Sequence, residues 1–161
     1  MSALRELRPG LYRWTARHPD AEADPQAGSP ADWGPYVGSA AYAARDTVVL
    51  VDPLVPADRS DLQEEVDELV RRHGKPVIIL TTLQFHRRSR DELVARYGAS
   101  TSRAKKILPE GVETIQIRGA GETMVWLPER GALIPGDRLL GDDRGGLRLC
   151  PQSWLRYLPS K

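Results

Sequence analysis

The stretch Thr47-Val-Val-Leu-Val51, which ends at Asp52-Pro53, decides the fold class of this chain. A continuous apolar run of this length is typical of a strand that is covered on both faces. Val77-Ile-Ile-Leu-Thr81 is a second run of the same kind. We therefore expect two fully buried strands.

The residues between and after these runs predict two helices. In the first, apolar residues recur at i, i+4, i+7 and i+8 and form one stripe. Ser60 with Gln63, and Ser89 with Glu92, have the spacing of capping boxes at the two helix starts. The order over 47–97 is strand, helix, strand, helix, which predicts an α/β unit with a parallel sheet.

The flanking regions predict further strands and one long loop. Residues 17–33 are rich in Pro, Ala, Asp and Gly without a period, so we expect a loop, either disordered or forming a rim over a site. Residues 141–161 show little period and are expected to be an irregular tail. The predicted additional strands are 11–15, 36–44, 112–117, 122–127 and 132–134.

Length and composition limit the class of protein. The chain has 161 residues, which predicts a single domain over 1–161, and its net charge of +1 gives no overall attraction to nucleic acid. Its one cysteine, Cys150, excludes an internal disulfide and a cysteine zinc cage. Apolar runs such as 77–80 are far shorter than the roughly 20 residues of a membrane span. We expect a cytoplasmic protein with no nucleic acid or membrane partner.

Three segments in this order resemble the metallo-β-lactamase fold of the metallo-hydrolase superfamily, an αββα sandwich. They are the strand ending in Val49-Leu-Val-Asp-Pro53, the strand 78–82 leading to His86, and the strand-turn-strand 123–137 ending in Gly136-Asp137. The resemblance covers about residues 8 to 140 and is closest to a small branch of actinobacterial type with a degenerate histidine motif. It implies an α/β sandwich, with truncation at the C-terminus left open.

The resemblance also implies metal-ligand positions, and most of them are changed here. The family motif His-x-His-x-Asp-His falls on Thr82, Gln84, His86 and Arg87, and the next family histidine falls near Arg118. Asp137 alone matches a ligand position directly. A catalytic zinc site needs about three protein ligands and an open position. We therefore expect no metal cofactor, with guanidinium groups of Arg87 and Arg118 pairing with Asp137 in place of the metals.

Each of these residues also has a structural interpretation. His86 is a residual ligand, a general base, or a helix-entry residue bonded to the backbone. Asp137 is either an active-site acid or a turn residue, and Arg87 with Arg118 forms either an anion-binding fork or internal ion pairs. Arg88 and Arg90 are expected on a solvated helix face.

Three hypotheses for the function follow. The first is a divergent, metal-free protein that binds a small anionic molecule or a partner. The second is a hydrolase of an ester, thioester or lactone that holds one zinc ion on His86 and Asp137. The third is an interaction module that a second copy completes as a homodimer, and enzymatic activity stays open. The catalytic candidates are His86 and Asp137, and the ligand-binding candidates are Gln84, Arg87, Arg118 and Trp33.

Overall fold

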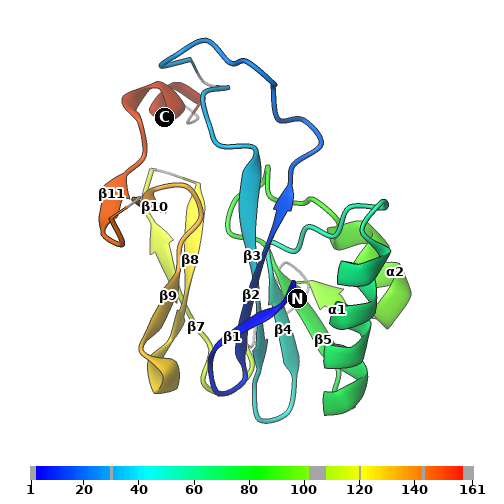
Figure 1. Cartoon of the computed structure of the whole chain (residues 1–161). Helices are drawn as coiled ribbons and strands as arrows, with labels where there is room; N and C mark the ends of the chain where they lie inside the picture. Colours follow the sequence, from blue (N-terminus) through cyan, green and yellow to red (C-terminus); the bar gives the residue numbers. More distant parts are fainter. Residues whose placement is uncertain (1–2, 30, 102–107, 120, 143, 158–161) are drawn as a thin grey trace.

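Two β-sheets lie face to face, and both α-helices cover the outer face of the first sheet (Figure 1). This computed structural model describes residues 3–29, 31–101, 108–119, 121–142 and 144–157. The order of layers is therefore helix, sheet, sheet.

The first sheet has six strands in chain order. Its one long parallel pair is β4 with β5, in which Val48 lies opposite Val77. Every residue of both strands is buried, so the two predicted buried strands are confirmed. The strands are β1 (Arg5–Arg8), β2 (Leu11–Arg17), β3 (Tyr36–Ala43), β4 (Val48–Val51), β5 (Val77–Leu80) and β6 (Ser100–Thr101).

Both predicted helices form, as α1 (Ser60–His73) and α2 (Arg90–Tyr97), and each is followed by a glycine in the left-handed region. The predicted capping boxes are wrong. The residue before α1 is Arg59, and no side chain caps either helix start. The Ser89 hydroxyl instead accepts from the Val55 amide at 2.9 Å and donates to the Val55 carbonyl at 3.1 Å.

The second sheet contains β7 (Glu113–Ile117), β8 (Glu122–Leu127) and β9 (Ala132–Ile134), with η1 (Pro128–Arg130) between the last two. Alternation along β4 divides the core, because successive side chains point to opposite faces. Val48 and Leu50 pack toward the helices, whereas Val49 and Val51 pack toward the second sheet.

No α-helix covers the outer face of the second sheet within the described part of the chain. The register places Ile115 opposite Met124 and Trp126 opposite Leu133 on this face. Ile115 and Leu133 are 44% and 38% exposed. Of the four layers that the resemblance implies, the described residues therefore form three.

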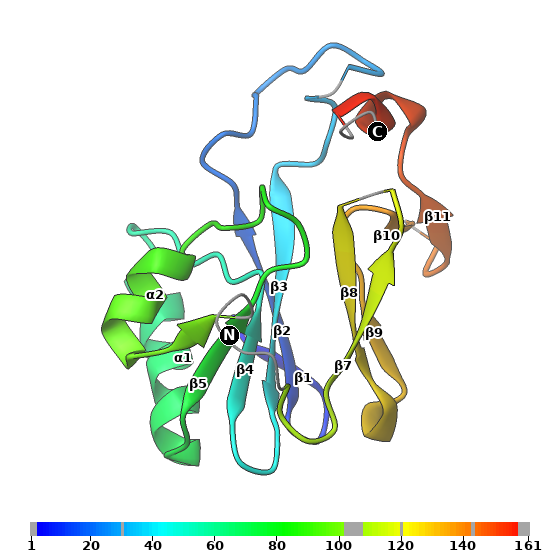
Figure 2. The same ribbon diagram turned by 180° about the vertical axis from the view of Figure 1, so that it is seen from behind.

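The stretch 141–161 is less irregular than expected. β10 (Leu139–Gly141) and β11 (Leu147–Leu149) form a hairpin, and η2 (Gln152–Tyr157) follows. The hairpin lies on the side of the second sheet that faces away from the helices (Figures 1 and 2). None of the described helices is both long and apolar enough to cross a membrane.

Candidate functional site

The carboxyl ends of the parallel strands β4 and β5 bring Asp52 and Thr82 together. Asp52 follows β4 and is 5% exposed, and Thr82 lies two residues beyond β5 and is 2% exposed. The Thr82 amide donates to Asp52 Oδ1 at 2.8 Å, and the Thr82 hydroxyl donates to Asp52 Oδ2. This buried carboxylate is therefore held in one orientation from the neighbouring strand.

His86 lies between two carboxylates. Its Nδ1 is 2.8 Å from Asp52 Oδ2, and its Nε2 is 3.1 Å from Asp137 Oδ1. The imidazole is 12% exposed and the Asp137 side chain 43%, so the cluster reaches the surface through Asp137. We call Asp52, His86 and Asp137 the carboxylate–histidine cluster.

The cluster favours the imidazolium form of His86. Burial lowers the pKa of His86, but its hydrogen bonds to Asp137 and Asp52 and the charges of both carboxylates outweigh burial and raise that pKa to about 9. At neutral pH both ring nitrogens therefore carry protons and donate to carboxylates. In this form the imidazole has no free lone pair with which to bind a metal ion or to act as a general base.

Arg88 adds a second cation beside the cluster. Its Nη1 donates to the carbonyls of Gly38 at 2.7 Å and Asp52 at 2.8 Å. Its Nε is buried and has no hydrogen-bond partner among the described residues. Burial lowers the pKa of Arg88, and the charges of Asp52 and Asp137 oppose this.

Backbone strain is concentrated at these two residues. Asp52 has φ of 45° and Arg88 has φ of 43°, and no other described residue except glycine has positive φ. Such conformations cost roughly 1–3 kcal/mol each and persist where the surrounding contacts fix them. Both residues with this strain lie at the site.

The loop between β2 and β3, described over residues 18–29 and 31–35, extends over this edge of the sandwich (Figure 1). Burial lowers the pKa of His18 in this loop, and the nearby charges of Arg88 and His86 lower it further, although Asp20 raises it. The Trp33 ring packs edge-on against His18 at 5.2 Å between ring centres. The rim over a site stays a prediction, and these contacts show that His18 lies near Arg88 and His86.

The other ligand-binding candidates lie in exposed positions. Gln84, Arg87 and Arg118 are exposed, and their side chains form no hydrogen bond or ion pair within the described residues. The expected pairing of Arg87 and Arg118 with Asp137 is therefore wrong. The ion-pair partner of the Asp137 carboxylate is the His86 imidazole. The expectation that Arg88 lies on a solvated helix face is wrong as well, since its guanidinium holds the backbone beneath the site.

The sequence does not identify Asp52 or Arg88 as site residues, nor Glu122 as a buried residue. Asp52 had a usable signal, since the ends of parallel strands meet at one edge of a sheet and carry sites there. Arg88 had no signal beyond its place in the loop. Glu122 starts an ordinary strand, and its burial, 0% exposed, depends on a distant loop.

Few residues at the aligned ligand positions have a donor atom free for a metal ion. At the positions aligned with the family motif, the Thr82 hydroxyl is bound to Asp52 and Arg87 is a fixed cation. His86 and Asp137 supply two donors, one fewer than a catalytic zinc site uses. No group of three or more His, Cys, Asp or Glu with the geometry to hold a metal ion occurs in the described parts of the chain.

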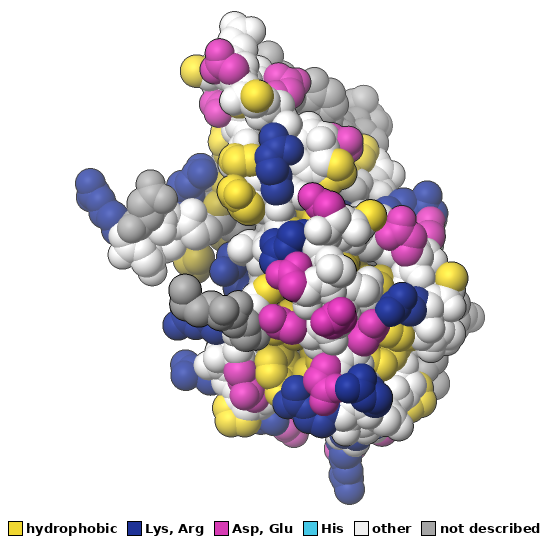
Figure 3. All heavy atoms as spheres, turned by 45° about the vertical axis from the view of Figure 1, so that its right-hand side comes forward, with side chains coloured by type: hydrophobic (Ala, Val, Ile, Leu, Met, Phe, Trp, Pro, Cys, Tyr) yellow, Lys and Arg dark blue, Asp and Glu magenta, His cyan; other side chains and the backbone are white. Residues whose placement is uncertain are grey.

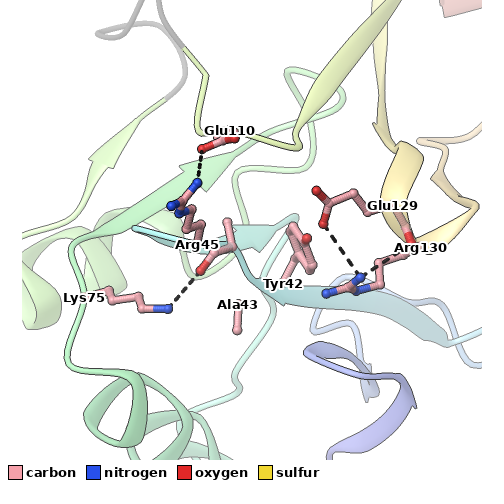
Figure 4. Close-up of a pocket in the computed structure, with 8 residues that line it drawn as sticks. Tyr42, Ala43, Arg45, Lys75, Glu110, Glu129 and Arg130 are labelled. Carbon is pink, nitrogen blue, oxygen red and sulfur yellow. Dashed lines mark hydrogen bonds and ion pairs between the residues drawn. The ribbon is translucent and has the colours of Figure 1, made fainter.

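Two hollows lie away from the cluster. One, of about 350 Å³, lies at the opposite end of β3, where Arg45, Lys75 and Arg130 already pair with Glu110 or with backbone carbonyls (Figure 4). The other, of about 530 Å³, lies beside α1, over which acidic side chains gather (Figure 3). Neither hollow includes a residue of the carboxylate–histidine cluster.

Comparison with solved structures identifies the fold. The crystal structure of DIM-1 metallo-beta-lactamase matches with a TM-score of 0.59 at 14% identity, over 87% of this chain and 71% of that chain. The metallo-beta-lactamase from Hirschia baltica matches with a TM-score of 0.56 at 15% identity, over 86% and 72%. Metallo-beta-lactamase IND-7 matches with a TM-score of 0.51 at 16% identity, over 87% and 72%.

The chain therefore has the metallo-β-lactamase fold, as the resemblance implied. No protein-family model matches its sequence, and no curated protein matches it either. Identities near 15% define the fold and leave the activity to be argued from the site itself.

Proposed function

We propose that this protein is a divergent, metal-independent member of the metallo-β-lactamase fold that binds a small anion at the edge where its two sheets meet. The observation that carries the proposal is a run of three consecutive cations, His86, Arg87 and Arg88. They lie in the loop 82–89, which contains no acidic residue. Asp52 and Asp137 face this loop, so the local charge is 3 − 2 = +1.

Arg88 supplies the specific reason for an anion. A buried N–H without an acceptor costs roughly 1–3 kcal/mol, and a ligand oxygen would recover that free energy. The Arg88 Nε is such a group within the described structure. Guanidinium groups suit carboxylate and phosphate oxygens, and the exposed Arg87 can add a second contact at the rim.

The role of His86 in this proposal is electrostatic. Its imidazolium offsets one of the two negative charges of Asp52 and Asp137, which would otherwise repel an anion more strongly. Because both ring nitrogens are used, His86 contributes charge and leaves direct recognition to the arginines. The proposal therefore contains no metal cofactor, and a zinc-dependent hydrolase of an ester, thioester or lactone is the alternative that metal analysis distinguishes.

Calorimetric titration with inorganic phosphate at fixed ionic strength tests the proposal. We expect saturable binding by the protein, about tenfold weaker binding by Arg87→Ala, and unchanged binding by Arg45→Ala. Arg45 is a matched control because its side chain is 82% exposed at the opposite end of β3. Equal loss in both variants, or no saturable binding to phosphate or acetate, would contradict the proposal.

A second candidate function is self-association through the outer face of the second sheet. Four of the seven large hydrophobic residues exposed in the described structure lie on this sheet or its hairpin: Ile115, Leu133, Leu147 and Leu149. Glu113 is the single acidic side chain that the register adds on the exposed part of this face. The exposed apolar residues of this face suit a partner with a similar apolar face, and a second copy provides one.

The size of this face predicts a weak dimer. Three strands about 4.8 Å apart, of five, six and three residues, give a face of at most roughly 14 by 20 Å. Its area is below the roughly 800 Å² per partner that stable dimers bury. Light scattering over a concentration series should show a dimer that Leu133→Lys abolishes and that Phe85→Lys, on the distant site loop, leaves unchanged. A monomer at every concentration contradicts this second function.

A further inference from the structure

Glu122 is a fully buried carboxylate that the proposed function does not use. It is 0% exposed at the start of β8. Its nearest cation is Arg138, whose Nε lies 3.9 Å from Glu122 Oε2, too far for a direct hydrogen bond. Burial of a carboxylate is unfavourable unless its oxygens accept hydrogen bonds, so the partners of Glu122 indicate its role.

Those partners are three consecutive backbone amides. The amide of Gly136 donates to Oε1, and the amides of Asp137 and Arg138 donate to Oε2, each at 3.1 Å. Consecutive N–H groups that converge on one anion form a concave cradle. Here the anion belongs to the protein itself, and the cradle is the segment that carries Asp137.

Gly136 lets this segment approach closely. A β-carbon at this position would lie 2.9 Å from Thr82 Oγ1, closer than real β-carbons approach, and 3.0 Å from Glu122 Cδ, which is also unusually tight. The segment therefore passes between Thr82 and Glu122. The Thr123 amide also donates to the Thr82 carbonyl at 2.9 Å, which joins β8 to the site loop.

The two carboxylates that hold His86 are thus fixed in parallel ways. Thr82 fixes Asp52 by its amide and its hydroxyl. Glu122 fixes Asp137 through the backbone, while Asp137 Oδ1 reaches His86 Nε2 at 3.1 Å. Asp137 is partly exposed, and a surface carboxylate without such support would lose side-chain and backbone freedom to keep this contact.

We propose that Glu122 is the positioning residue of the site, which acts through Asp137 to hold the His86 ring between its two carboxylates. Glu122 forms no hydrogen bond or ion pair with His86, Arg87 or Arg88 within the described structure, so we expect its effect to reach these residues by way of Asp137. The inference rests on the proposed function only where the effect is measured as anion affinity.

The test uses Glu122→Gln, which keeps the shape but presents an amide N–H₂ to donors that need an acceptor. We expect the pKa of His86, followed by NMR of its ring proton, to fall by about 1 as Asp137 loses its fixed position. Phosphate affinity should fall about tenfold. Glu113→Gln, on the exposed strand β7, is the control and should change neither quantity.

A double-mutant cycle separates positioning from mere stability. In an Asp137→Asn background, Glu122→Gln should produce no further change in the pKa of His86, because its effect passes through Asp137. Glu122→Asp keeps the charge and should lower the pKa of His86 by less than Glu122→Gln does. It serves as the second variant if Glu122→Gln fails to fold.

Two results overturn the inference. One is a Glu122→Gln or Glu122→Asp protein that is folded and less stable but titrates His86 as the unchanged protein does. The other is an equal effect of Glu122→Gln with and without Asp137. If phosphate binds no variant at all while the His86 titration responds as described, the proposed function fails and the positioning role stands.

Discussion

The protonation of His86 predicts how the stability of the fold depends on pH. The pKa of His86 is about 9 in the folded protein, against 6.5 for an ordinary histidine. The folded state therefore binds the proton more tightly than the unfolded chain does. The resulting stabilisation is fully present below pH 6.5 and is lost as the pH rises through 9.

The magnitude follows from the difference between the two pKa values. One pKa unit corresponds to 1.36 kcal/mol, so the rise to about 9 gives roughly 3 kcal/mol. His86 is 12% exposed, so solvent reduces this value only modestly. A loss of this size is a large fraction of the roughly 5–15 kcal/mol by which domains are stable.

Urea denaturation between pH 6 and pH 10 measures this loss. The free energy of unfolding should fall by about 3 kcal/mol across the range. In His86→Gln, whose side chain does not titrate, the curve should be flatter by that amount, and the difference between the two curves isolates His86 from other titrating groups. Parallel curves for the two proteins would refute the reasoning, as would a His86 ring proton that titrates near 6.5.

Three further substitutions have expected effects on the free energy of unfolding. Thr82→Val removes the hydroxyl that donates to buried Asp52 and should lower stability by about 1–3 kcal/mol in urea denaturation; an unchanged midpoint would show that this hydrogen bond adds nothing. Gly136→Ala places a methyl group 2.9 Å from Thr82 Oγ1 and should cost about 1–3 kcal/mol in thermal denaturation, whereas equal stability would mean that the loop shifts freely. Ser89→Ala removes both side-chain bonds to Val55, so the Val55 amide should exchange with solvent about tenfold faster or more, and unchanged exchange contradicts the assignment.

The buried half of the first sheet could be predicted because hydrophobic pattern and burial have the same cause. The runs at Val48–Val51 and Val77–Leu80 are apolar on both faces since helices pack on one side and a second sheet on the other. The short strands β1, β6, β10 and β11 were missed because they are exposed or only two to four residues long. Such segments have no periodic apolar pattern.

The site could be predicted only in part. His86 and Asp137 were identified by their place in the resemblance, but the contact between them depends on how β9 and the loop after β5 meet in space. The arginines were assigned to Asp137 because charge alone does not show which cation is nearer. The structure shows that the His86 imidazole contacts Asp137, with Asp52 on the other side of the ring.

Glu122 shows the limit of sequence reasoning most clearly. In the sequence it is the first residue of a hairpin strand, where a glutamate usually lies in solvent. Its burial depends on three amides that come from residues 14 to 16 positions later in the chain. No local pattern predicts such a contact, and only the folded geometry reveals it.

Metal content tests the central claim most directly. The purified protein should be incubated with excess zinc at pH 7, dialysed, and analysed for metal alongside His86→Ala and Asp137→Ala. We expect far less than one zinc per chain, with no difference among the three proteins, because protonated His86 has no lone pair for a metal. Close to one zinc per chain, lost in both variants, would contradict the account and make the protein a mononuclear metal-hydrolase candidate.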